Sequence, residues 1–138
     1  MRPLLLSLAA LLLVAAQSPI PAPEPEWRMA IEHDVLLRPW AYEPKIIRLP
    51  AGRPIRLLFV NQSPAVMAFG ARDFFRAARM RPRDADVAAR GGFRLAPGER
   101  RAIDLVAPPG RYRARSFNLL HRLLGMSAEI VVEEGLRP

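Results

Sequence analysis

The chain has 138 residues, enough for one domain with a single modest core. It contains no cysteine, which excludes disulfides and every thiolate-based metal, redox or nucleophilic site. Its formal net charge is +8, carried almost wholly by arginine because Lys45 is the single lysine. No basic run is interleaved with aromatic residues, so we expect no nucleic-acid partner. The charge suits either an acidic partner or simple solubility.

The N-terminal residues predict export. Residues 1–16 carry a basic residue at position 2, an apolar run from position 4 onward and a small-residue boundary at 14–16. The run is shorter than the roughly 20 residues that cross a bilayer, which favours a signal peptide over the alternative of an uncleaved anchor. Residues 17–27, where proline alternates with small and acidic residues, are interpreted as an extended tether. We expect a periplasmic or otherwise exported domain over residues 28–138, with no transmembrane segment in the mature chain.

Alternation of apolar and polar residues with a period of two dominates from Trp27 onward and predicts β-strands. We expect strands at residues 29–37, 45–49, 55–60, 93–95, 101–106, 111–116 and 128–133, separated by turns rich in proline and glycine. Residues 72–80 are the one expected helix, with Phe74 and Phe75 on its apolar face. Residues 81–92 are expected to form a polar surface loop. About seven strands and one short helix predict an all-β, antiparallel β-sandwich.

The stretch over residues 31–133 resembles exported bacterial cupredoxin-like domains. The resemblance rests on the Ala51-Gly52 turn before a strand ending at Asn61, on Gly110-x-Tyr112 entering a later strand, and on Phe74-Phe75 in a short helix. The most specific motif is His121-x-x-x-Gly125-Met126 leading into the last strand. This resemblance implies a cupredoxin-like Greek-key β-sandwich.

Cupredoxins hold one copper ion with two histidines, one cysteine and a weakly bound methionine. The resemblance aligns Met67 with the first histidine, Ser116 with the cysteine, His121 with the second histidine and Met126 with the methionine. Two of the four ligands therefore match. Because a serine hydroxyl is a poor copper ligand, Ser116 is not expected to bind, and electron transfer of the blue-copper kind is nearly excluded.

Met67, His121 and Met126 form a soft set of donors that favours Cu(I). We therefore predict atypical copper binding or handling. The expected partner is a copper-handling or acidic exported protein. Methionine also fills gaps in apolar cores, and residues 119–124 are rich in leucine. The alternative is accordingly a metal-free β-sandwich that acts as a protein-binding or assembly module. Residues 119–124 and the arginine-lined strand 111–115 would then form its contact surface.

Other chemistry has less support in the sequence. His33 lies in phase with the apolar face of the first expected strand, which is typical of a packed imidazole rather than a ligand. Ser116 and His121 have no orienting acid at a recognisable spacing. The carboxylates of Asp84, Asp86 and Asp104 are scattered and are interpreted as solvated or turn residues. We expect no enzymatic activity.

Overall fold

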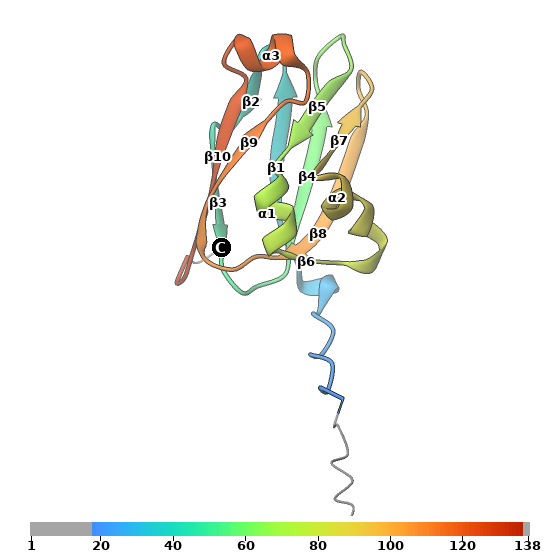
Figure 1. Cartoon of the computed structure of the whole chain (residues 1–138), viewed down its shortest axis with the longest axis vertical. Coiled ribbons are helices and arrows are strands. Elements are labelled where there is room, and N and C mark those ends of the chain that lie inside the picture. Colours follow the sequence, from blue (N-terminus) through green and yellow to red (C-terminus); the bar gives the residue numbers. More distant parts are fainter. Residues whose placement is uncertain (1–17, 137–138) are drawn as a thin grey trace, which may run out of the picture.

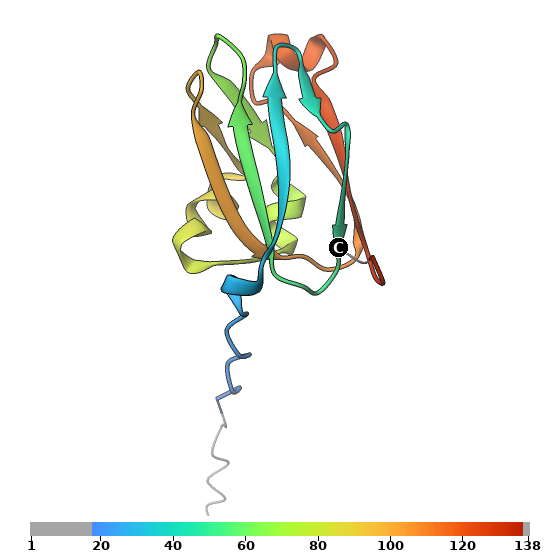
Figure 2. The ribbon, with the colours of Figure 1, turned by 180° about the vertical axis from the view of Figure 1, so that it is seen from behind.

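A computed structural model describes residues 18–136 of the chain. Within that range, ten strands form two five-stranded sheets, with the orders β2-β1-β4-β8-β6 and β3-β10-β9-β5-β7. Figure 1 looks onto the second sheet, and Figure 2 looks onto the first from behind. The predicted all-β sandwich is confirmed. The predicted signal peptide, residues 1–16, lies outside the described residues.

The elements have the following bounds. The first sheet contains β1 (Ile31–Arg38), β2 (Ala41–Glu43), β4 (Ile55–Asn61), β6 (Arg79–Met80) and β8 (Arg100–Val106). The second sheet contains β3 (Ile46–Pro50), β5 (Met67–Gly70), β7 (Gly92–Leu95), β9 (Gly110–Arg115) and β10 (Ser127–Glu133). The helices are α1 (Arg72–Ala77), α2 (Ala85–Arg90) and α3 (Leu119–Leu123), with 3-10 turns η1 (Trp27–Met29) and η2 (Pro82–Asp84).

Two pairs of neighbouring strands run parallel, β1 with β4 and β3 with β10, and the other pairs are antiparallel. The parallel pairs arise because the chain crosses between the sheets. After β2 it passes to the second sheet as β3, and then returns to the first sheet beside β1 as β4. Alternation within one strand shows which face is buried but not the direction of its neighbour.

Residues 81–92 do not form the predicted surface loop. They contain η2 and α2, and Val87 on α2 is fully buried in the core. Gly91 ends α2 in the left-handed conformation at φ 77°, which glycine adopts without steric cost. The helix has six residues, fewer than two turns, so its periodicity is too short to recognise in the sequence. The prediction of a single helix was therefore wrong, and α1 over Phe74 and Phe75 is the helix that was predicted correctly.

Aromatic side chains from both sheets form the centre of the core. The ring of Phe59 lies 4.7 Å from that of Phe69 and 4.8 Å from that of Phe93, measured between centroids. All three side chains are buried, as are Phe74 and Phe75 of α1. This packing fixes the two sheets against each other. The loops at their ends are then held in place by the strands that enter and leave them.

Candidate metal centre

One end of the sandwich gathers the sequence-predicted ligands. We call it the apical end: it comprises α3, the turn between β1 and β2 at Trp40, and residues 62–66 between β4 and β5 (Figure 1). We call residues 116–126, which join β9 to β10, the apical loop. Each of the four positions taken from the cupredoxin resemblance lies in the apical loop or at the start of β5.

The apical loop is shaped by its own hydrogen bonds. The Oδ1 atom of Asn118 accepts a hydrogen bond from the Leu120 N–H at 2.9 Å and so caps the start of α3. The Asn118 N–H in turn donates to Ser116 Oγ at 3.2 Å. Gly125 follows the helix with φ 79°, which lets the chain turn back into β10. As a result His121 is 9% exposed while the leucines of α3 face outward.

Ser116 and His121 face each other inside the protein. The Oγ atom of Ser116 lies 3.4 Å from Nδ1 of His121, and Ser116 is 1% exposed. That separation is longer than the usual 2.7–3.2 Å hydrogen bond (about 3 Å). Two ligands bound to one metal at about 2.0 and 2.3 Å, at a tetrahedral angle, would be about 3.5 Å apart. The separation is compatible with two ligand positions of one metal ion, and equally with a long hydrogen bond or van der Waals contact between the two side chains.

Met126 closes the loop that Ser116 opens. Ser127 of β10 and Arg115 of β9 are the last pair of their ladder, so Met126 and Ser116 follow directly beyond it on the two strands. Met126 is 1% exposed and belongs to the hydrophobic core, and its N–H donates to the carbonyl oxygen of His121 at 3.0 Å. Ser116, His121 and Met126 are thus three buried residues of one loop.

Met67 reaches the same end of the sandwich from the neighbouring strand. It is the first residue of β5, and Gly70 of that strand pairs with Arg115 of β9. Because the two strands are antiparallel, Met67 lies three residues nearer the apical loop than Gly70 does. Its side chain is 2% exposed and belongs to the same core as Met126.

Asn61 fixes the approach to β5. Its amide Nδ2 donates to the carbonyl oxygens of Ala65 at 2.8 Å, Leu95 at 3.0 Å and Ala96 at 3.1 Å. Its Oδ1 accepts from the Ser63 N–H at 2.9 Å. One buried amide therefore ties residues 62–66 to the end of β7. This anchoring gives a structural reason for the asparagine at the end of the strand, which was one of the motifs noted in the sequence.

Two further residues of the apical end were not anticipated. Trp40 sits edge-to-face on His121, with ring centroids 5.3 Å apart and an interplanar angle of 89°. Tyr42 is buried beside Ser116, and its hydroxyl donates to the carbonyl oxygen of Ala68. Burial raises the pKa of Tyr42, opposed by a hydrogen bond with Ser116, so the phenol stays neutral. Trp40 adopts a positive φ of 64°, unusual outside glycine, and no sequence signal announces it.

His33 does not join the apical end. It pairs with Leu57 in the ladder between β1 and β4, seven residues before Trp40 and thus about 23 Å away along an extended strand. Its Nε2 atom is buried without a hydrogen-bond partner in the structure. Burial lowers its pKa, although Asp34 acts in the opposite direction. Within residues 18–136, no three side chains of the His, Cys, Asp and Glu types form a metal-binding group.

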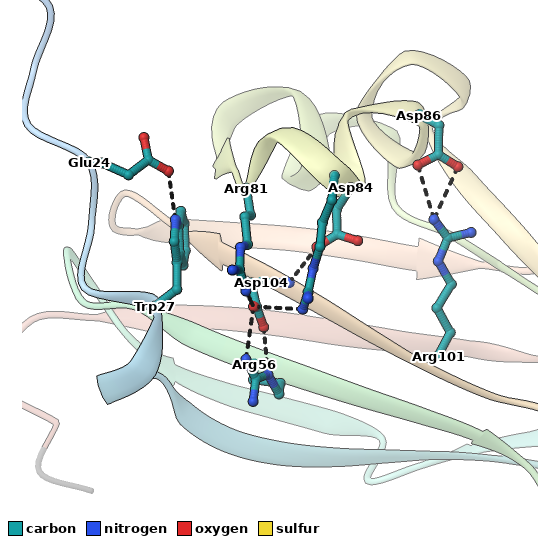
Figure 3. Close-up of polar contacts among 9 residues, drawn as sticks. Glu24, Trp27, Arg56, Arg81, Asp84, Asp86, Arg101 and Asp104 are labelled. Carbon is teal, nitrogen blue, oxygen red and sulfur yellow. Dashed lines mark hydrogen bonds and ion pairs between the residues drawn. The ribbon is translucent and has the colours of Figure 1, made fainter.

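Of the three carboxylates interpreted as solvated or turn residues, Asp86 is exposed as expected, but Asp84 and Asp104 are buried. Asp104 is fully buried and accepts hydrogen bonds from Arg56 at 2.7 and 3.0 Å, from Arg81 at 2.8 Å and from Arg83 at 2.9 Å (Figure 3). Asp84 is 5% exposed and accepts from the Asp104 N–H at 3.0 Å. This network fastens η2 to β8 and β4. Its carboxylates are all engaged by arginines or backbone, which is typical of a structural role.

No protein-family model and no curated protein matches the sequence, but solved structures do match. A reduced auracyanin from the photosynthetic bacterium Roseiflexus castenholzii matches with a TM-score of 0.57 and 21% identity, over 75% of this chain and 98% of its own. Auracyanin A, a "blue" copper protein from Chloroflexus aurantiacus, matches with a TM-score of 0.52 and 16% identity, over 75% and 99%. A multi-copper oxidase from Pediococcus acidilactici gives 0.58 at 12% identity, over 75% of this chain and 26% of that one. The chain therefore has the cupredoxin-like β-sandwich fold.

Proposed function

We propose that this protein is an exported cupredoxin-like domain that binds copper as Cu(I) at its apical end and handles copper rather than carrying electrons. The observation that carries the proposal is the 3.4 Å separation of Ser116 Oγ and His121 Nδ1, two buried residues of the loop that Met126 closes. This spacing supports the proposal because two ligands of one metal ion lie about as far apart.

The chemistry of the donors favours Cu(I). His121 offers an imidazole nitrogen, and Met126 and Met67 offer thioether sulfurs, which are soft ligands suited to Cu(I). A serine hydroxyl forms its alkoxide only with difficulty, so Ser116 supplies no replacement for the strong bond between a thiolate and Cu(II). Bound copper would supply a soft, positively charged centre. The chain's contribution would be to hold it away from water, because the three donor side chains are each at most 9% exposed.

Export is the second part of the proposal and is supported by the signal-like residues 1–16. In the described part of the chain, residues 18–136, we find no helix with the length and apolar character needed to cross a membrane. The absence of cysteine is compatible with an oxidising compartment, since no thiol can be oxidised there.

Copper binding is tested by titrating residues 17–138 with Cu(I) against a competing chelator. One equivalent should bind, and His121→Ala should weaken binding at least about tenfold through the loss of the imidazole ligand. His33→Ala is the matched control, because it removes the other histidine far from the apical end and should leave the affinity unchanged. If no copper binds at micromolar concentration, the proposal fails.

A metal-free protein-binding module is the second candidate, and the exposure of α3 favours it. Leu119, Leu120, Leu123 and Leu124 are 64%, 55%, 75% and 56% exposed, so more than half of each side chain faces solvent. Clustered apolar side chains on a surface mark an interaction site more often than chance exposure does. Under this candidate, His121→Ala would change neither the partner nor its affinity. The copper titration therefore separates the two.

A further inference from the structure

A basic groove crosses the outer face of the second sheet beneath α3. Its volume is about 910 Å³. It runs over β10 and β9, from the start of β3 to α3, on the sheet that faces the viewer in Figure 1. The charged side chains that line it are Lys45, Arg111, Arg113, Arg115 and Arg122 against the single carboxylate of Glu129. The groove therefore carries a large excess of positive charge.

Most of this positive charge has no counter-ion in the described part of the chain. Glu129 pairs with Arg111 at 3.2 Å. Within residues 18–136, Arg113, Arg115 and Arg122 form no ion pair, and neither does Lys45. Other arginines of residues 18–136 also lack an ion pair, Arg94 among them. The groove differs because three such arginines and one lysine line a single concave surface.

The charge extends into a second, smaller hollow. That hollow has a volume of about 260 Å³ and shares Arg113, Arg115 and Arg122 with the groove. It adds Arg72 at the start of α1, next to the carboxylate of Asp73. The three shared arginines therefore separate two adjoining concave surfaces. A ligand longer than one side chain can contact both.

The spacing of the arginines on β9 matches an extended chain. Arg111, Arg113 and Arg115 are exposed, while Ala114 between them is buried. Alternate residues of a strand lie about 6.6 Å apart on one face. A ligand in extended conformation presents its own alternate side chains at the same interval, so carboxylates at every second residue would each meet one guanidinium. Arginine binds a carboxylate with two parallel hydrogen bonds, so each matched pair would strengthen the binding.

The end of the groove near α3 is apolar. Leu119 and Leu123 line it there, and Leu123 is 75% exposed. Ile46 of β3, 48% exposed, lies on the opposite side of the groove. A ligand that fills the groove would therefore place acidic side chains along β9 and an apolar side chain against α3. A flat anionic membrane surface does not fit a concave site of this shape.

We propose that this groove binds an extended, acidic segment of a partner protein, with carboxylates at alternate residues followed by an apolar residue. The inference deepens the second candidate function, protein binding, by naming the chemistry of the partner. Met126, a candidate ligand, is among the residues that line the groove, but none of the charged residues on which the inference rests is a candidate ligand. Burial of the leucines of α3 by the same partner would explain why they are exposed in the isolated chain.

The test uses the mature chain and a fluorescent peptide, Glu-Thr-Glu-Thr-Glu-Leu-Leu, measured by anisotropy at low and high salt. The double variant R113Q/R115Q should weaken binding about five- to tenfold, and added salt should weaken it further. R94Q is the matched control, because Arg94 is an exposed arginine on β7 of the same sheet but outside the groove. R94Q makes a single neutral replacement and should change the affinity less than about twofold.

Three results would overturn the inference. Equal binding of the peptide with glutamine in place of glutamate would leave only apolar docking, which keeps the second candidate function but not its acidic partner. Equal weakening by R94Q and by R113Q alone would show a non-specific response to net charge. Binding to phosphatidylglycerol vesicles without binding to the peptide would assign the surface to lipid. A Cu(I) titration of R113Q/R115Q, expected to be unchanged, keeps the outcome separate from the fate of the copper proposal.

Discussion

The ring of Phe117 lies against the bare backbone of Gly92, so close that a Cβ atom on Gly92 would stand 2.6 Å from the Phe117 Cζ atom. Gly70, on the neighbouring strand, also lies under this ring: a Cβ atom on Gly70 would stand 2.8 Å from Phe117 Cε1. Phe117 is the second residue of the apical loop. The backbone of two glycines, on β5 and β7, therefore forms the surface against which the Phe117 ring packs, and this packing anchors the loop.

Gly92→Ala should accordingly destabilise the protein by about 2–3 kcal/mol through overpacking. Its Cβ would also overlap the carbonyl oxygen of Phe69, which is backbone and cannot move aside. Gly52→Ala is the control, since no atom lies within 4 Å of its Cβ position and only the positive φ of 70° opposes the change. That variant should lose about 1 kcal/mol. Urea unfolding measures the free energy of unfolding of both variants. An equal decrease in the two would contradict the proposed packing of Phe117 on Gly92.

Removing the Asp104 carboxylate should be among the most costly polar substitutions. Asp104→Asn leaves Arg56, Arg81 and Arg83 without their shared acceptor charge and should lower the free energy of unfolding by about 3 kcal/mol. Asp86→Asn provides the comparison, because its ion pair with Arg101 is on the surface and should contribute less than about 1 kcal/mol. Thermal unfolding of the two variants ranks them. A smaller effect at Asp104 than at Asp86 would refute the structural role.

Acid should weaken the fold in two separate pH windows. Burial lowers the pKa of His33, so below about pH 6.5 the unfolded chain takes up a proton that the folded chain refuses, and stability falls. Burial alone would raise the pKa of Asp104, but the hydrogen bonds of Arg56 and Arg81 outweigh it and hold that pKa below its usual range. The stability from Asp104 is present above about pH 4 and is lost as the pH falls through the lowered pKa.

Urea unfolding across pH 2–8 separates these windows, on the scale set by their usual pKa values of about 4 and 6.5. His33→Leu should remove the decline below about pH 6.5 and leave the acid limb intact. Asp104→Asn should do the reverse. A profile that keeps both declines in His33→Leu would show that another group controls the upper window.

Trp40 should report copper binding directly, because its ring contacts His121. In Trp27→Phe, where Trp40 is the remaining tryptophan, one equivalent of Cu(I) should change the fluorescence through contact of the bound cation with the indole. In Trp40→Phe, the remaining Trp27 lies at the other end of the sandwich, hydrogen-bonded to Glu24, and its emission should stay constant. A signal from Trp27 instead would place the metal elsewhere.

Ser116→Cys should partly rebuild a thiolate site. With the sulfur about 3.4 Å from His121 Nδ1, as the oxygen is now, Cu(II) should bind and give the strong visible absorption of a copper–thiolate bond. Ser127→Cys is the control, because Ser127 is exposed on β10 and is not one of the candidate ligand positions. Both variants have one thiol, but only the first should turn coloured. A colourless Ser116→Cys would show that the loop no longer holds ligand geometry.

The parts of this structure that could be predicted are those with local repetition. The alternation in residues 111–116 predicted β9, and the turn residues around positions 50–54 and 96–99 predicted where strands end. The parallel pairing of β1 with β4 could not be predicted, because it depends on the chain visiting the other sheet in between. The six residues of α2 are too few to show a helical period. The motif around His121 predicted the apical loop only because a related pattern was recognised.

The candidate ligands stay a prediction, and the side chains that surround them were not predicted at all. The contact between Trp40 and His121 joins positions 81 residues apart and follows only from the packing of two turns. The burial of Asp104 was missed because an isolated carboxylate in an alternating strand resembles a solvated one. Its three arginines come from β4, from the residue between β6 and η2, and from η2, which approach Asp104 only in the folded chain. Sequence distance thus limited the prediction more than residue chemistry did.

Arg79 donates to the carbonyl oxygens of Pro23 at 2.9 Å and Ala22 at 3.2 Å, so the segment before η1 is fastened at the end opposite α3 (Figure 1). The eight residues of β1 alone span about 26 Å between that base and the apical end. Residues 22–26 therefore leave the sandwich at the base, so they leave the apical end uncovered. A partner of the kind proposed above would reach the apical loop without displacing this segment.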